Sequence, residues 1–273
     1  MKFNCGITGH SGVLGTEIIK NNPRVKFIKF NGDITRKEEV KGWLNKNKIN
    51  YLFHFAAIVP TRIVKKKLNY ANKVNYLGTK YLVDEILKSN NIKWIFFSST
   101  SHVYGFSNKQ VSEKKKPNPI SKYGLTKLKA EKYIQKKLSK KVPYCIGRIF
   151  SFTHKRQSDE FVIPSILKKI KNKKNICEFN NTNHYRDFLH TKDISKAIML
   201  LYKSQSVGIF NIGSGKKTLI TNIIYLISKK LKKNCIVKNN TKNNTCLVAD
   251  IRKIKKLKWK PTQNLKNLIY ELI

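Results

Sequence analysis

Short apolar runs alternate with amphipathic stretches along most of the chain. Continuous apolar runs are typical of strands that are covered on both faces. We predict strands at Lys2–Thr8, Val25–Phe30, Tyr51–Phe55, Trp94–Ser99, Val142–Ile149 and Gly208–Ile212. Apolar positions at helical spacing predict helices between them, at Gly12–Asn21, Arg36–Asn47, Tyr70–Ser89, Lys122–Leu138 and Lys192–Tyr202, with Thr191 as the N-cap of the last. This alternation predicts an α/β fold with a doubly wound parallel sheet.

The alternation breaks between residues 151 and 185 and again after residue 213. We therefore predict two domains, which a chain of 273 residues is long enough to form. Residues 1–150 and 186–212 form the sheet domain. Residues 151–185 and 213–273 form a smaller lobe, which we expect to close over the carboxyl edge of the sheet.

The cysteines are scattered, with no Cys-x-x-Cys pair and no histidine cluster beside them: Cys5, Cys145, Cys177, Cys235 and Cys246. This spacing favours reduced thiols and gives no support for a metal site. The first residues already have the pattern of a strand, so we expect no signal peptide. No apolar run approaches the roughly 18–20 residues that a membrane span needs. We expect a soluble, cytoplasmic protein with no membrane partner.

The formal net charge of +42 raises the question of a nucleic-acid partner. Only seven of the 57 basic residues are arginine, the usual reader of base edges. The lysines are spread along the whole chain, and abundant Lys, Asn and Ile together are what AT-rich codons produce. We therefore expect no nucleic-acid partner. A strongly positive field would still attract anionic small molecules.

A glycine-rich turn follows the first predicted strand and opens the first predicted helix. Gly9 permits the tight turn, Gly12 lets the backbone approach a phosphate, and Gly15 lets the helix pack close to the strand. Between strand and helix, this spacing is typical of a dinucleotide site with its pyrophosphate at the helix N-terminus. The expected pyrophosphate contacts are Gly9, Ser11, Gly12, Val13, Leu14 and Gly15.

The end of the second strand bears on which dinucleotide would bind. NAD sites usually carry an acidic residue there, for the ribose 2′-hydroxyl. The sequence has none, and Lys29 is placed to face a 2′-phosphate, so NADP is slightly preferred over NAD. Asp33 and Ile34 follow at positions suited to an adenine contact, although Asp33 also suits a simple cap before Arg36.

Four Tyr-x-x-x-Lys matches occur, at Tyr76/Lys80, Tyr123/Lys127, Tyr133/Lys137 and Tyr225/Lys229. With 12 tyrosines in so lysine-rich a chain, the motif alone carries little information. Only Tyr123 begins a helix shortly after a strand that ends in a run of hydroxyl residues, Ser98 to Ser101. On that helix Tyr123 and Lys127 share one face. The nearby positive charge is expected to favour the phenolate, so that the tyrosine acts as an acid or base near neutral pH.

The order of motifs resembles that of extended short-chain dehydrogenases/reductases, within the NAD-dependent epimerase/dehydratase group that acts on nucleotide sugars. The matching positions are Gly9/Gly12/Gly15, Gly32-Asp33, His54-Phe55-Ala56-Ala57, Val74-Asn75 with Gly78-Thr79, Ser98–Gly105, Tyr123-x-x-x-Lys127, Arg148-Ile149-Phe150, Arg186 to His190 with Asp193, Asn211-x-Gly213-x-Gly215, Asp250 and Trp259-Lys260-Pro261. The resemblance implies a Rossmann domain that binds NAD(P), a C-terminal lobe that binds a nucleotide sugar, and a homodimer formed through the helices at 70–89 and 122–138.

The resemblance also implies roles for individual residues. Tyr123 becomes the acid/base on a sugar oxygen, Thr100 polarises that oxygen, and Lys127 lowers the pKa of Tyr123 and holds the nicotinamide ribose. Arg186 would clamp the diphosphate, a task suited to its bidentate fork, unless it pairs with Asp187 or Asp193. Further expected cofactor contacts are Ala56, Ala57, Asn75 and Ser98, and further substrate contacts are Ser101 and Ser151.

The residues after Thr100 bear on the reaction. Dehydratases of this family carry Asp-Glu there, whereas this chain has Ser101 and His102, which argues against dehydration. His102 is either a second acid/base beside a ketone or a hydrogen-bonded structural histidine. The stretch from Phe150 to Pro164 is similar to that of 4-keto-6-deoxy-mannose reductases, although Ser151 and His154-Lys155 depart from it. We expect reduction of a nucleotide-linked 4-keto sugar. The alternatives are a 4-epimerase and a catalytically silent dinucleotide-binding protein, regulatory or RNA-associated.

Overall fold

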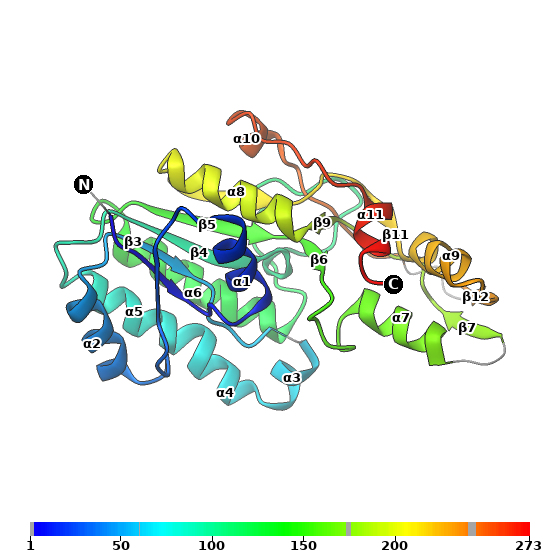
Figure 1. Cartoon of the computed structure of the whole chain (residues 1–273), viewed down its shortest axis with the longest axis horizontal. Coiled ribbons are helices and arrows are strands. Elements are labelled where there is room, and N and C mark those ends of the chain that lie inside the picture. Colours follow the sequence, from blue (N-terminus) through cyan, green and yellow to red (C-terminus); the bar gives the residue numbers. More distant parts are fainter. Residues whose placement is uncertain (1–2, 60, 173–175, 240–243) are drawn as a thin grey trace. The chain divides into compact units, whose positions relative to one another are not determined.

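The computed structural model describes residues 3–59, 61–172, 176–239 and 244–273 (Figure 1). The chain divides into two compact units. The sheet unit comprises residues 1–104, 116–149 and 195–210. The second unit comprises residues 105–115, 150–194 and 211–273, and we describe each unit by itself.

The sheet unit is built on a six-stranded sheet of order β10-β5-β4-β3-β1-β2. Its strands are β1 (Cys5–Thr8), β2 (Phe27–Lys29), β3 (Tyr51–His54), β4 (Trp94–Thr100), β5 (Tyr144–Ile149) and β10 (Gly208–Ile212). The pairs β1–β2, β1–β3, β3–β4 and β4–β5 are all parallel. The strand order reverses at β1, where a doubly wound sheet binds its ligands. The predicted α/β fold with a doubly wound parallel sheet is confirmed.

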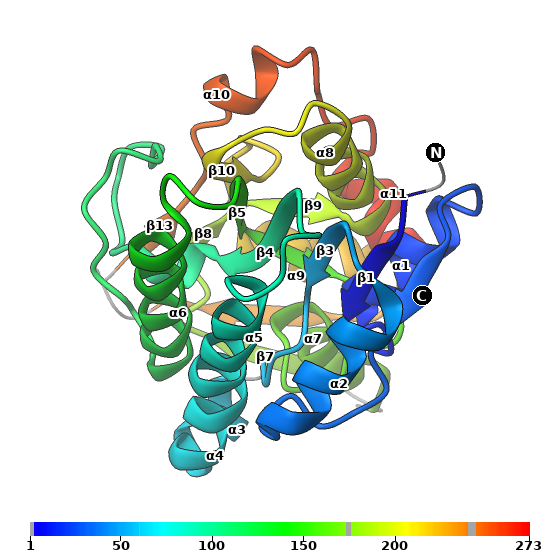
Figure 2. The ribbon, with the colours of Figure 1, turned by 90° about the vertical axis from the view of Figure 1, so that its left-hand side faces the viewer.

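Helices cover both faces of this sheet. Those of the sheet unit are α1 (Val13–Asn21), α2 (Lys37–Asn47), α3 (Thr61–Lys66), α4 (Leu68–Asn72), α5 (Gly78–Ile86) and α6 (Lys122–Leu138), with most of α8 (Thr191–Lys203). Figure 2 shows α2, α5 and α6 along one face and α8 along the other. On the α8 face the Tyr202 ring packs against Phe53 and Trp94, with ring centroids 5.3 and 5.9 Å away.

Several element boundaries differ from those predicted, for local reasons. The helix expected at 70–89 is divided by a π-helical turn at Lys73–Leu77. β5 starts at Tyr144, since Val142 still bonds back to the end of α6 and Pro143 has no N–H to donate. Thr191 is the first residue of α8 instead of its N-cap. β1 begins at Cys5, and Lys2 of the predicted strand lies outside the described residues.

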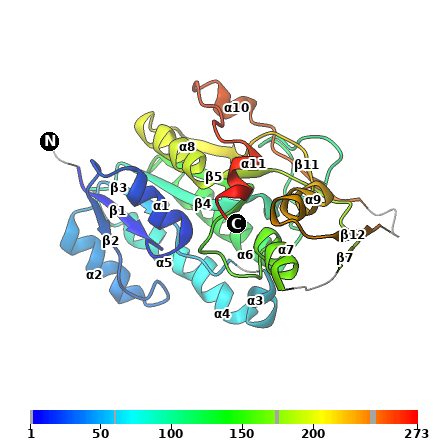
Figure 3. The same ribbon diagram turned by 45° about the vertical axis from the view of Figure 1, so that its right-hand side comes forward.

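The second unit has short strands and helices around its own isoleucine-rich core (Figure 3). Its elements are β6 (Ser151–Thr153), α7 (Val162–Asn172), β7 (Cys177–Asn180), β8 (Tyr185–Arg186), β9 (Phe188–His190), β11 (Thr218–Leu219), α9 (Ile220–Leu231), β12 (Cys235–Lys238), β13 (Cys246–Leu247), α10 (Arg252–Lys255) and α11 (Leu265–Tyr270). The strands form the small sheets β11-β8-β13, β12-β7 and β6-β9.

The two units depart from the predicted domain division at residues 105–115 and 186–194, and by one or two residues at 150 and 211–212. Residues 105–115 belong to the second unit, where Val111 bridges Ala249. Residues 186–194 also belong there, because buried Asp187 accepts hydrogen bonds from Ser214 and Ala249. In the part of the chain that the structure describes, no helix combines the length and apolar character that crossing a membrane requires.

Candidate active site

The glycine turn joins β1 to α1 at the reversal point of the sheet. Gly9 has φ +66°, in the left-handed region, and a Cβ there would lie 2.5 Å from the Ala56 nitrogen. A Cβ on Gly15 would lie 2.3 Å from the Gly9 oxygen. Both positions therefore require glycine, and they bring the N-terminus of α1 close to the ends of β1 and β3. Ser11 and Gly12 are exposed there, and Val13 and Leu14 are partly buried in the first turn of α1.

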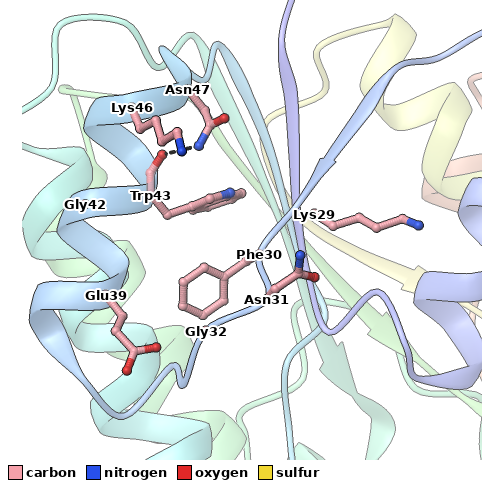
Figure 4. Close-up of a pocket in the computed structure, with 9 residues that line it drawn as sticks. All are labelled: Lys29, Phe30, Asn31, Gly32, Glu39, Gly42, Trp43, Lys46 and Asn47. Atoms are coloured by element: carbon pink, nitrogen blue, oxygen red, sulfur yellow. Dashed lines mark hydrogen bonds between the residues drawn. The ribbon is translucent and has the colours of Figure 1, made fainter.

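Two open pockets flank the end of β2. The turn pocket, of about 480 Å³, is lined by His10, Ser11, Thr16, Ile19, Lys20 and Lys29. The α2 pocket, of about 380 Å³, is lined by Lys29, Phe30, Asn31, Gly32, Glu39, Gly42, Trp43, Lys46 and Asn47. Figure 4 shows the Lys29 side chain pointing away from the Phe30 and Trp43 rings of the α2 pocket. Lys29 thus lies beside the glycine turn, and its expected contact with a 2′-phosphate stays a prediction.

Asp33 and Ile34 follow β2 and have local roles in the structure. The Asp33 carboxylate accepts hydrogen bonds of 2.8 Å from both the amide and the hydroxyl of Thr35, which lower its pKa. Ile34 is buried and packs on Gly78 at the start of α5. Their expected contact with adenine stays a prediction.

Thr100 and Tyr123 meet where β4 ends and α6 begins. Both side chains are buried, and the Thr100 hydroxyl faces the Tyr123 phenol. Burial raises the pKa of Tyr123, and the neighbouring Thr100 hydroxyl opposes this only in part. The net shift is thus upward, and the expected lowering of this pKa by Lys127 stays a prediction.

Lys127 lies one helical turn beyond Tyr123 and is 1% exposed. Its Nζ lies 4.0 Å from the centroid of the Phe97 ring on β4. Burial lowers the pKa of Lys127 to about 7, although the Glu131 carboxylate acts in the opposite direction. The ammonium is thus poised to change charge near neutral pH.

A buried ion pair that no sequence motif indicated lies next to Lys127. The Arg148 Nη2 lies 2.6 Å from Oε2 of Glu131, and both side chains are almost wholly buried. The Ser99 hydroxyl donates to the same carboxylate, and the Arg148 guanidinium also stacks over the Tyr104 ring. The one available signal was that Glu131 follows Lys127 by four residues, on the buried face of α6.

His102 is attached to the start of α6. Its Nδ1 lies 3.0 Å from the hydroxyl of Ser121, and Ser121 also caps the helix by accepting from the Gly124 amide. The His102 ring packs edge-on against Tyr123, with centroids 5.9 Å apart. Ser101 is buried in the short 3₁₀ turn Ser101–Val103. His102 thus has a structural hydrogen bond beside the candidate acid/base, and its role in catalysis stays a prediction.

Asn75 lies in the π-helical turn, with its side chain already bonded to protein groups. Its amide oxygen accepts from the Ile58 N–H at 2.7 Å, and its amide nitrogen donates to the Ile58 carbonyl and to Thr126, both at 3.0 Å. Asn75 therefore holds the segment after β3, which contains Ala56 and Ala57. On the neighbouring strand β4, Ser98 is partly buried two residues before Thr100.

Arg186 and Ser151 belong to the second unit. The Arg186 guanidinium donates to the carbonyls of Tyr185 and Thr245, at 2.8 and 3.0 Å, and stacks on Phe106. The two carboxylates considered as its partners have other bonds: Asp187 accepts from Ser214, Gly215 and Ala249, and Asp193 accepts from Thr262 and Gln263. Ser151 begins β6 and is partly buried.

The glycine turn at the reversal point and the Thr100, Tyr123, Lys127 group together define a Rossmann-fold protein of the extended short-chain dehydrogenase/reductase class. The chain belongs to the NAD dependent epimerase/dehydratase family, whose model matches residues 6–213. It is therefore an enzyme of the kind that acts on nucleotide sugars.

Similar proteins include both epimerases and reductases. A putative UDP-glucose 4-epimerase of Methanocaldococcus jannaschii is 28% identical, over 98% of this chain and 96% of that protein. A dTDP-4-dehydro-6-deoxyglucose reductase of Escherichia coli is 27% identical, over 87% of this chain and 78% of that protein. Among solved structures, RMD from Pseudomonas aeruginosa complexed with NADPH superposes with a TM-score of 0.87, at 19% identity, covering 99% of this chain and 97% of that one. The last similarity concerns the fold alone.

Proposed function

We propose that this enzyme reduces a nucleotide-linked 4-keto sugar by hydride transfer from a nicotinamide dinucleotide. The observation that carries the proposal is that Thr100 and Tyr123 are buried next to each other, with Lys127 buried one helical turn further along α6. Two hydroxyls and a cation grouped at the carboxyl end of β4 suit a carbonyl oxygen that must gain a proton.

The glycine turn fits a dinucleotide. Side chains at Gly9 and Gly15 would clash with the backbone of the turn and its neighbours, so glycine at both positions keeps the N-terminus of α1 beside the turn, where a pyrophosphate would bind. We assign the nicotinamide end to Ala56, Ala57, Ser98, Tyr123 and Lys127, with Asn75 supporting the segment after β3. When bound in reduced form, the dinucleotide supplies the hydride.

The protein's own residues supply the proton. Burial keeps the Tyr123 phenol protonated at neutral pH, so it can donate to the sugar oxygen while the carbonyl carbon receives hydride and becomes an alcohol carbon. The Lys127 ammonium stabilises the phenolate that is left, and the Thr100 hydroxyl bonds to the same sugar oxygen. Lys127 is protonated in only part of the molecules at neutral pH, so its charge should control the rate.

The residues after Thr100 support reduction over dehydration. Eliminating water requires an acid/base pair there, and this chain has buried Ser101 and His102 held by Ser121. We also propose that Ser101 and Ser151 contact the sugar and that Arg186 binds its diphosphate, with His102 as a second acid/base where the substrate requires one.

The turn pocket supports a preference for NADP. Its lining includes Lys20, Lys29 and His10 and no carboxylate, so a 2′-phosphate would be favoured there. RMD from P. aeruginosa, which shares the fold, was solved with NADPH.

A 4-epimerase is the second candidate. The M. jannaschii relative, similar over 98% of this chain, is named as a putative UDP-glucose 4-epimerase. Epimerisation would use the same Tyr123 in both directions, oxidising the sugar carbon and reducing it again with one retained dinucleotide.

The test is incubation of the purified enzyme with NADPH and a panel of nucleotide-linked 4-keto sugars, with NMR of the products. Reductase activity predicts one NADPH consumed for each alcohol formed. Interconversion of two 4-hydroxy sugars without added dinucleotide would favour the epimerase. Failure to bind any dinucleotide would exclude both reactions.

A further inference from the structure

A chain of buried hydrogen bonds starts at the glycine turn and passes through His54. The Ala56 N–H donates to the Thr8 hydroxyl at 3.3 Å, and that hydroxyl lies 2.6 Å from Nδ1 of His54. The opposite nitrogen, Nε2 of His54, lies 2.9 Å from the hydroxyl of Thr79. His54 is fully buried, and no step of the proposed reaction uses it.

The direction of each bond follows from counting hydrogens. The single hydroxyl hydrogen of Thr79 is donated to the Asn75 carbonyl at 2.9 Å, so Thr79 must accept from His54. His54 therefore carries its proton on Nε2, and Nδ1 accepts from Thr8. Burial, with Lys127 nearby, lowers the pKa of His54 to about 3, which agrees with a neutral ring.

The chain continues from Asn75 into the catalytic helix. The Asn75 side-chain amide donates to the Thr126 hydroxyl at 3.0 Å, and Thr126 donates to the Tyr123 carbonyl at 2.8 Å. The side chains of Thr8, Thr79 and Thr126 are each 2% exposed or less. An ordered path thus runs from the turn that would hold the dinucleotide to the backbone of the candidate acid/base.

We propose that His54, Thr79 and Asn75 are positioning residues that couple the glycine turn to Tyr123. This inference rests on the proposed function. Each hydrogen bond from Thr8 to the Tyr123 carbonyl is buried, so losing one of them leaves unpaired polar groups on both sides. The π-helical turn at Lys73–Leu77 places the Asn75 carbonyl and side chain to bond Thr79 and Thr126 together. These hydrogen bonds thereby fix the position of the Tyr123 phenol relative to the site of hydride transfer.

The first test removes the central hydroxyl. Thr79→Val is expected to lower kcat about tenfold or more while the Kd for the dinucleotide changes by less than about threefold, because the turn itself is intact. Thr79→Ser, which keeps the hydroxyl, should restore most of the turnover. Ser195→Ala is the control. It removes a buried hydroxyl that accepts a hydrogen bond from Asn22 and is not part of the path from Thr8 to Tyr123, so it should leave kcat unchanged. Equal kcat in Thr79→Val and wild type, measured on folded protein, would overturn the proposal.

The second test needs no activity. Long-range ¹H–¹⁵N NMR of the free protein should show that His54 is neutral and carries its proton on Nε2. This should hold at every pH above 5 at which the protein stays folded. Thr126→Val should shift the His54 Nε2 proton resonance, and Ser195→Ala should not. An Nδ1–H tautomer of His54, or a His54 Nε2 proton resonance that does not shift in Thr126→Val, would contradict the coupling even if the enzyme proves to be a reductase. If no sugar is turned over, the proposed function fails and this experiment still decides the coupling.

Discussion

Glu131 and Arg148 form a buried ion pair within one helical turn of Lys127, with Nη2 2.6 Å from Oε2 and Nε 3.1 Å from Oε1. The carboxylate also favours the charged form of Lys127. The pair thus links β5 to the face of α6 that carries the candidate acid/base, and the Ser99 hydroxyl, which donates to the same carboxylate, adds the strand that carries Thr100.

Glu131→Gln should destabilise the protein and change its pH dependence. Removing one partner of a buried pair leaves the Arg148 charge uncompensated, which typically costs about 3–5 kcal/mol of unfolding free energy. Denaturant unfolding measures this. Glu85→Gln, at a buried carboxylate that pairs with an exposed lysine, is the matched control and should cost less. Equal stability losses in the two variants would contradict the structural role of Glu131.

The rate should depend on the charge of Lys127. Burial lowers its pKa to about 7, so kcat/KM for the free enzyme should fall as the pH rises through about 7 and the ammonium is lost. Since Glu131 raises this pKa, a folded Glu131→Gln variant should lose activity at a lower pH than wild type. Stopped-flow or steady-state pH profiles provide the measurement. A flat profile between pH 6 and 9 would show that the charge of Lys127 does not limit the reaction.

Lys29 should select between the two dinucleotides. Lys29→Glu places a carboxylate in the turn pocket, and we expect NADPH to bind at least about tenfold more weakly while NADH binding is unchanged or improved. Lys46→Glu, which makes the same charge change in the α2 pocket but not in the turn pocket, should alter neither. Binding titrations with both dinucleotides test this. An equal loss of NADPH affinity in the two variants would show that the effect comes from the general charge change and not from a contact between Lys29 and the dinucleotide.

We also propose the homodimer expected through the helices at 70–89 and 122–138. The outward face of α6 exposes Lys122, Lys129, Lys132 and Lys136, so two copies would bring like charges together. Salt screens such repulsion, and the dimer should therefore strengthen between low and high ionic strength. Light scattering during size-exclusion chromatography at two salt concentrations measures it. Dissociation at high salt would argue for an interface built on ion pairs elsewhere.

The sheet and the bounds of α6 could be predicted because they depend on local patterns. Apolar runs identify the strands, and Ser121 marks the start of α6 by capping it. The interruption at Asn75 could not be predicted, because its cause is a side chain that bonds Ile58 across the fold.

Only the part of the candidate site that carries recognisable motifs was predicted. Thr100, Tyr123 and Lys127 stand in recognisable order, but their burial is a property of the fold, and burial raises the pKa of Tyr123. His54 is a single polar residue in an apolar stretch, and Glu131 is one charged residue in a lysine-rich helix. Their partners, Thr79 and Arg148, are identified only once the chain is folded.

The central claim is that Tyr123 protonates the sugar oxygen during reduction. The direct measurement is NADPH oxidation with an accepted nucleotide-linked 4-keto sugar, by wild type and by Tyr123→Phe. The account predicts that kcat falls by about 10²–10⁴ in the variant while NADPH binds with unchanged Kd. Turnover by Tyr123→Phe at the wild-type rate would contradict it.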